Sequence, residues 1–243
     1  MYFFENIEIY LLDINKDMTN TWERFFKNVP NVKVINNDFA SFMNQNPQIE
    51  AIVSPANSFG IMTGGYDKAI IDYFGKDLMK DVQDYIIEHY CGEQPVGTSF
   101  SIPINNFNKS HLIHTPTMRT PEVINDSRVI YSCMRSTLIE CLKKNYGSVV
   151  IPAFGACTGK VDYREVANMM RLAYEQLTHI PDGLNWANVL RFELYEHNQY
   201  SHAEGFCNNP SNPNFNKIPC SHNVSSEKYK RYTFEDTGSY TIA

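Results

Sequence analysis

Short apolar runs alternate with amphipathic stretches along the first 180 residues of the chain. The runs have strand length and are rich in β-branched and aromatic residues, whereas the stretches between them repeat apolar residues at helical spacing. The predicted strands are residues 7–12, 32–35, 49–53, 97–104, 111–116 and 148–154. The predicted helices are residues 17–28, 39–44, 65–74, 76–90, 127–145 and 163–178. This alternation predicts an α/β fold with a largely parallel or mixed sheet and helices on both faces.

The pattern changes beyond about residue 190, where polar residues and prolines replace the periodic apolar positions. Residues 208–214 contain only Asn, Pro and Ser, a composition typical of loops and disordered segments. We therefore expect one domain over residues 1–186 and a loop-rich or partly disordered C-terminal extension over residues 187–243, with a short strand near residues 229–233. An extra layer, a partner-binding arm and disorder all remain open for this extension.

The most informative stretch is residues 53–67, which lie between the third predicted strand and the next helix. Pro55 and Asn57 end the strand, and three glycines let the backbone turn sharply and approach a ligand closely. The order of strand, glycine loop and helix aims backbone N–H groups at the space above the strand end, which suits an anion such as phosphate. Asn57 adds a directional amide, and Asp67 adds a carboxylate in the first helical turn. On spacing alone, a helix-opening turn stabilised by Asp67 explains the stretch about as well.

Two more features follow predicted strands in the same way. Asp38 comes after the second strand, and the glycine-containing loop of residues 155–160 comes after the sixth. In open α/β sheets, ligands bind outside the carboxyl ends of the strands. Three polar or glycine-rich features at one edge therefore favour a ligand site, although Asp38 alone fits a helix N-cap equally well.

Composition and charge narrow the function classes. The formal net charge of −6 argues against a general binder of nucleic acids or membrane surfaces, but it leaves a small anionic ligand open. No apolar run approaches the roughly 18 residues of a transmembrane helix, and the first residues lack the basic region of a signal peptide. The six cysteines show no tight pairing, so we expect reduced thiols and a cytoplasmic protein of unknown oligomeric state.

Together these stretches resemble the macro domain, an ADP-ribose-binding α/β/α module, and in particular a phage- and bacteria-associated branch of that family. The resemblance covers roughly residues 5–180. Residues 57–67 resemble the first binding loop, in which an Asn precedes an Asp by about ten positions, with a Gly pair before the Asp. Residues 151–159 resemble the second, diphosphate-binding loop. Residues 37–39 stand where the family has a Gly-Asp-Ile type turn, and residues 114–121 resemble a segment typical of the branch.

The resemblance implies a three-layer α/β/α fold and a role for each matched residue. Asp38 would accept a hydrogen bond from the adenine amino group, and the backbone at Phe39 would meet the ring. Asn57, next to Ala56, would contact the distal ribose hydroxyls, and Asp67 matches the acid proposed to act in hydrolytic members. The distal ribose and its phosphate would be lined by the main chain of Gly64, Gly65 and Tyr66. The diphosphate would be wrapped by Gly155, Ala156, Cys157, Thr158 and Gly159.

Three positions depart from the family pattern. Ala156 and Cys157 replace a Thr-Gly-like pair in the second loop. Tyr66 stands where a small aliphatic residue is usual, and Lys160 follows the loop where the branch often has Gly.

The implied function is ADP-ribose binding together with hydrolysis of ADP-ribosyl linkages by a bound water. Asp67 would act as the base, and Asn57 would orient the ribose for attack. The alternatives are a non-catalytic reader of ADP-ribose and a phage- or virion-associated scaffold. No cofactor or metal is required, and the expected partner is ADP-ribose or an ADP-ribosylated substrate, with no membrane and no general nucleic-acid binding.

Overall fold

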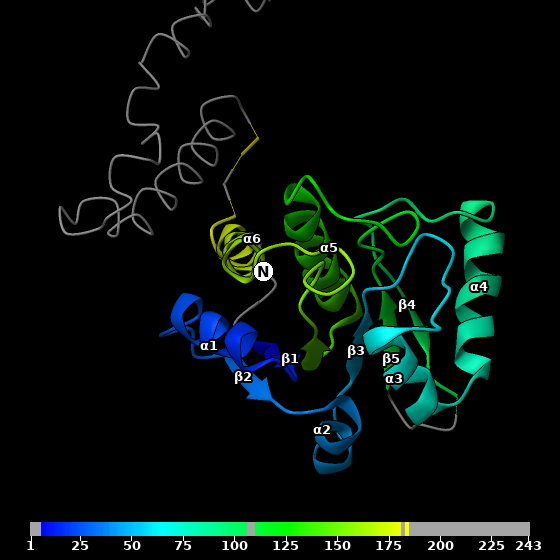
Figure 1. Cartoon of the computed structure of the whole chain (residues 1–243), viewed down its shortest axis with the longest axis horizontal. Helices are drawn as coiled ribbons and strands as arrows, with labels where there is room; N and C mark the ends of the chain where they lie inside the picture. Colours follow the sequence, from blue (N-terminus) through cyan, green and yellow to red (C-terminus); the bar gives the residue numbers. More distant parts are fainter. Residues whose placement is uncertain (1–5, 106–109, 181–182, 185–243) are drawn as a thin grey trace, which may run out of the picture. The chain divides into compact units, whose positions relative to one another are not determined.

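The computed structural model describes residues 6–105, 110–180 and 183–184, and all structural statements below concern these residues. Six strands form one sheet in the order β2-β1-β6-β3-β5-β4 (Figure 1). Every neighbouring pair in it is parallel except β4 with β5. The strands are β1 (Glu8–Asp13), β2 (Val32–Asn36), β3 (Ala51–Ser54), β4 (Phe100–Pro103), β5 (His111–His114) and β6 (Ser148–Ile151).

Helices cover both faces of this sheet (Figure 1). One face carries α1 (Lys16–Phe25), α5 (Arg128–Lys144) and α6 (Tyr163–Thr178). The other carries α2 (Phe39–Gln45), α3 (Gly65–Phe74) and α4 (Asp77–Tyr90). The predicted α/β fold, with a mixed sheet between two helical layers, is therefore confirmed.

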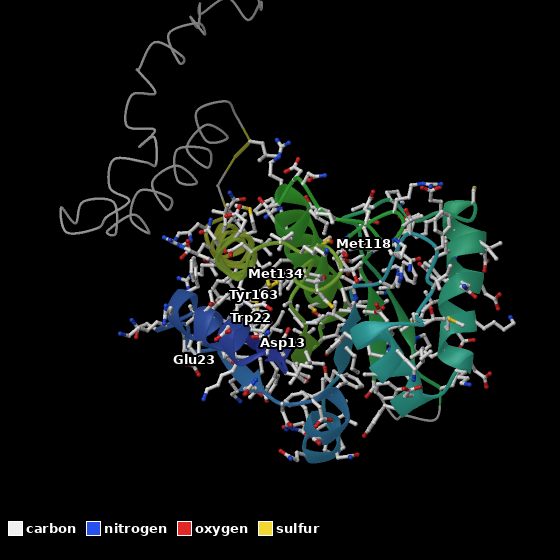
Figure 2. The ribbon with its side chains drawn as sticks, in the orientation of Figure 1. Asp13, Trp22, Glu23, Met118, Met134 and Tyr163 are labelled. Carbon is white, nitrogen blue, oxygen red and sulfur yellow. The ribbon has the colours of Figure 1, made fainter. Side chains whose placement is uncertain are left out.

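Alternate residues of the strands supply two separate hydrophobic cores. In β1, Ile9 and Leu11 belong to the core under α1, α5 and α6, whereas Tyr10 and Leu12 belong to the core under α2, α3 and α4. Trp22 of α1 is fully buried in the first core (Figure 2). Burying one large apolar side chain contributes about 1.5–3 kcal/mol, so both faces hold the sheet firmly.

The element boundaries shift where caps and turns intervene. The helix predicted from residue 17 begins at Lys16, because the Asn15 side chain accepts hydrogen bonds from the backbone N–H groups of Asp17 and Met18 in the first turn. The strand predicted from residue 97 begins at Phe100, because Gly97 adopts a left-handed φ of +79°. In the part of the chain described, no helix is long and apolar enough to cross a membrane. The predicted extension over residues 187–243, including its strand, lies outside the described residues.

Parallel pairing brings the carboxyl ends of five strands to one edge of the sheet. Leu11 is paired with Ile151, and Ile52 with Val150, so β1 and β3 end on either side of β6. Asp38 follows β2, the 53–67 stretch follows β3, and the 155–160 loop follows β6. The prediction that these three features share an edge is confirmed.

Candidate functional site

The first turn of α3 is open and uncapped. Gly64 is its N-cap residue, and no side chain forms a capping hydrogen bond there. Gly65 has a left-handed φ of +55°. A Cβ atom built on either glycine would meet no atom within 4 Å, so the backbone here borders open space. This is the arrangement in which the start of a helix can receive an anion.

The carboxyl of Asp67, in the same helical turn, is hydrogen-bonded at the end of β3. The hydroxyl Oγ of the fully buried Ser54 donates a hydrogen bond of 2.6 Å to Oδ1 of Asp67. Burial raises the pKa of Asp67 to about 7, although the Ser54 hydrogen bond acts in the opposite direction. A carboxyl group with this pKa exchanges a proton readily at neutral pH, which is the property required of a general base.

Tyr66 lies next to Asp67 and carries an unsatisfied polar atom. Its hydroxyl is buried and forms no hydrogen bond to any described group. Its ring packs edge-to-face on Phe39, with the ring centroids 5.3 Å apart. Burial raises the pKa of Tyr66 well above its ordinary value, and the nearby charges of Asp67 and Asp13 raise it further. The hydroxyl is therefore a permanently neutral O–H group.

Asn57 is buried and organises the first loop. Its Nδ2 donates to the carbonyl oxygen of Ile61 at 2.9 Å, and its Oδ1 accepts from the backbone N–H of Phe59 at 3.1 Å and of Ile61 at 3.3 Å. Its main chain forms a parallel β-bridge with Met118, which Figure 2 labels. The side chain of Asn57 thus fixes the loop, with Ala56 buried beside it, and contact with a ribose stays a prediction.

Asp38 is the N-cap of α2, which is the simpler of the two roles that the sequence suggests for it. Its Oδ1 accepts a hydrogen bond of 2.9 Å from the backbone N–H of Ser41. Hydrogen bonds from Ser41 hold the pKa of Asp38 below its ordinary value, so the exposed carboxylate is ionised at neutral pH. The ring of Phe39 is buried in the second core. Whether the Asp38 carboxylate or the Phe39 backbone also meets adenine stays a prediction.

The second loop is closed by tight packing of its glycines. A Cβ on Gly159 would lie 2.6 Å from the carbonyl oxygen of Gly155 and 2.6 Å from Cδ1 of Ile124. The Ile124 N–H also donates to the Gly159 carbonyl oxygen at 2.9 Å. Lys160 adopts a left-handed φ of +53°, a conformation that glycine adopts more readily than other residues. Between the glycines, Thr158 and the free thiol of Cys157 are exposed, and Ala156 is half-buried.

Two polar residues of this edge were missed by sequence reasoning. Ser54 was treated as loop, and nothing in the sequence signals that its hydroxyl meets Asp67 thirteen positions later. Asp13 was not considered, although it follows a predicted strand in the same way as Asp38. It is the last residue of β1, and burial raises its pKa. Applying the strand-end rule to every strand would have found Asp13.

Other chemistry is not evident among the described residues. They contain no group of three or more His, Cys, Asp or Glu side chains that could hold a metal ion. Their four cysteines, Cys91, Cys133, Cys141 and Cys157, are free thiols.

Comparison with known proteins finds a similarity over the central part of the chain. The macro domain family model matches residues 53–170. An uncharacterized protein of Aquifex aeolicus (strain VF5) is 26% identical over 121 residues, which make up 50% of this chain and 70% of that relative. The matched segment contains both glycine loops, whereas Asp13 and Asp38 precede it.

Similar solved structures include two bacterial macrodomains. That of Mycobacterium tuberculosis DarG has a TM-score of 0.46 and 21% identity, covering 53% of this chain and 83% of that chain. The Oceanobacillus iheyensis macrodomain, solved with ADP, has a TM-score of 0.49 and 20% identity, covering 65% of this chain and 86% of that chain.

Proposed function

From the match of residues 53–170 to the macro domain family, we propose that this chain binds ADP-ribose and hydrolyses ADP-ribosyl linkages with a bound water. The assignment to the phage- and bacteria-associated branch belongs to the same proposal. ADP-ribose carries two phosphates, which suit the uncapped start of α3 and the N–H groups of two glycine loops. It also carries two riboses and an adenine, which suit the polar groups at the strand ends.

The observation that supports hydrolysis is the placement of Asp67. Its carboxyl lies beside an open helix start, is held by Ser54, and ionises near neutral pH. A free surface carboxylate with a pKa near 4 would be a weaker base, because a base works best when its pKa lies close to the working pH. The burial of Asp67 therefore serves proton transfer better than it serves stability.

For an ester between ADP-ribose and a carboxyl side chain, the reaction needs one water. Asp67 removes a proton from this water as the water oxygen bonds to the anomeric carbon of the distal ribose. The bond from that carbon to the ester oxygen breaks, and its electron pair leaves with the carboxylate of the modified side chain. The products are ADP-ribose and the free carboxylate, and Asp67 returns its proton to solvent.

One observation favours a second candidate function, a non-catalytic reader domain that binds ADP-ribose without hydrolysing it. Asn57 was predicted to orient the ribose, yet both ends of its amide are engaged within the loop. If the amide keeps these bonds when ligand is bound, ribose positioning falls to main-chain groups. The site would then bind ADP-ribose without holding it for attack.

Binding and turnover measured on the same variants separate the two candidates. We expect the wild-type chain to bind ADP-ribose in calorimetry and to release it from a peptide that carries an ADP-ribosylated glutamate. Asp67→Asn keeps the size of the side chain and an acceptor for Ser54, so it should retain binding within about threefold and lose at least about a hundredfold in turnover. Asp72→Asn is the matched control, since Asp72 lies on the same helix in an exposed ion pair with Lys68.

The outcomes lead to different conclusions. Binding without turnover by the wild-type chain would establish the second candidate, a non-catalytic reader of ADP-ribose. Equal turnover by the wild type and Asp67→Asn would remove Asp67 from the mechanism. Absence of ADP-ribose binding would overturn both candidates.

A further inference from the structure

Two carboxyl groups lie at the ends of strands that flank β6, and Tyr66 directly precedes one of them in the sequence. Asp13 ends β1, and Asp67 is bonded to Ser54 at the end of β3. Because β6 separates these strands, the two strand ends are about 10 Å apart, two strand spacings. Asp13 is paired with Asn36 at the end of β2, three residues before Phe39, and the ring of Tyr66 packs on Phe39.

The position of the Tyr66 ring relates the ends of β3 and β2. Tyr66 starts on α3, which follows β3, and its ring packs on Phe39, which follows β2. In the sheet, β6 and β1 lie between β3 and β2. The ring therefore lies between α3 and α2, on the face of the sheet that these helices cover.

The hydroxyl of Tyr66 is an unusual group to leave in this place. It is buried, and no described group accepts its hydrogen. Leaving a buried polar group without a partner generally costs about 1–3 kcal/mol. Oδ1 of Asp13 accepts a hydrogen bond from the backbone N–H of Asn15 at 2.7 Å. Asp13 is only half-buried and is the last residue of β1 (Figure 2), so a ligand can approach it.

The chemistry of these groups selects the ligand atom. A phosphate oxygen accepts from Tyr66 but is repelled by two carboxylates. An amine donates to the carboxylates but cannot accept from a phenol hydroxyl when protonated. An alcohol both accepts from the Tyr66 O–H and donates to a carboxylate, so one sugar hydroxyl satisfies both groups.

We propose that Asp13 and the Tyr66 hydroxyl form a subsite that holds a hydroxyl of a ribose of the bound ligand. This inference rests on the proposed binding of ADP-ribose and goes beyond the family resemblance, which implies only a main-chain role for Tyr66 and none for Asp13. Tyr66 and Asp13 are binding residues in this assignment. The phosphates remain with the glycine loops.

Tyr66→Phe tests the hydroxyl while keeping the ring on Phe39. We expect calorimetry with ADP-ribose to show about a threefold to tenfold weaker affinity, the loss expected for one hydrogen bond. The unliganded variant should unfold at the same temperature as the wild type or higher, because an unsatisfied hydroxyl has been removed. A purely structural tyrosine would not combine weaker binding with undiminished stability.

Tyr73→Phe is the matched control, because Tyr73 lies on the same helix and also packs on Phe39, with centroids 5.8 Å apart. Its hydroxyl donates to Asn44 at the surface instead, so this variant should bind like the wild type. Asp13→Asn keeps the acceptor for Asn15 but removes the charge, and we expect it to weaken binding by a similar factor.

A second ligand shows which ribose is held. If the subsite takes the adenosine ribose, Tyr66→Phe weakens ADP and ADP-ribose equally. If it takes the distal ribose, only ADP-ribose is affected. Unchanged affinity of Tyr66→Phe for ADP-ribose overturns the subsite while leaving the proposed function intact, whereas failure of the wild type to bind ADP-ribose overturns both.

Discussion

Replacing Asp67 by Asn should make the protein more stable above neutral pH and leave it unchanged near pH 4. The folded state holds the pKa of Asp67 at about 7, against 3.8 for an ordinary aspartate, because burial disfavours the charged form. Between these two values the folded chain keeps a proton that the unfolded chain has lost. Stability contributed by the neutral carboxyl is therefore lost as the pH rises through this window, and the loss is complete above about pH 7.

The size of the effect follows from the same two values. A difference of this size corresponds to at most about 4 kcal/mol, at 1.36 kcal/mol for each pH unit. Asp67 keeps part of its surface exposed to solvent, which screens the charge. The expected effect is therefore about 1–3 kcal/mol. An amide at this position keeps the acceptor for Ser54 and carries no charge at any pH.

Urea denaturation of the wild type and Asp67→Asn at pH 4, 5, 6, 7 and 8 measures this difference directly. Groups other than Asp67 titrate in both proteins, so their contributions cancel in the difference between the two free energies of unfolding. We expect that difference to grow from near zero at pH 4 to its full value at pH 8. A difference independent of pH would refute the assigned pKa, and Asp72→Asn should show such a flat line.

Two more perturbations test the loops and the hydrogen bond. Ser54→Ala removes the bond that opposes the effect of burial, so it should move the rise of turnover with pH to higher pH, measured with the ADP-ribosylated peptide. Gly159→Ala forces a Cβ to within 2.6 Å of a backbone carbonyl oxygen, and urea denaturation should show about 1–3 kcal/mol of lost stability. Gly64→Ala meets open space and should change stability by less than about 0.5 kcal/mol.

The fold was largely predictable because its determinants are local and periodic. Each strand is a short apolar run, and the sheet is buried on both faces, so Ile9 to Leu12 reads as continuous apolar sequence. The boundaries were less accurate because they depend on individual turns: the left-handed Gly97 shortens a strand, and the Asn15 cap lengthens a helix. Strand order follows from no local pattern, and β1 lies between β2 and β6 only because of packing across the whole sheet.

The candidate site was only partly predictable, because its chemistry depends on which groups face each other. The sequence placed Asp67 in the first turn of a helix, where an exposed carboxylate would merely complement the helix dipole. Only the fold turns it toward Ser54 and raises its pKa to about 7. The fold has the opposite effect on Asn57, whose amide becomes a brace for its own loop.

Asp67 favours a working catalytic site, whereas the engaged amide of Asn57 argues against one. Tyr66 bears on both interpretations. Its ring packs on Phe39 of α2, and its buried hydroxyl forms no hydrogen bond within the part of the chain that the structure describes. A site that had lost all ligand contact would have no reason to retain this unsatisfied group, because phenylalanine would pack equally well and avoid a cost of about 1–3 kcal/mol. A hydroxyl group that weakens the free protein and strengthens the complex is the mark of a binding residue. The opposite signs expected for Tyr66→Phe in stability and in affinity therefore bear on more than one hydrogen bond, since they separate a working ligand site from a fold used only as a scaffold.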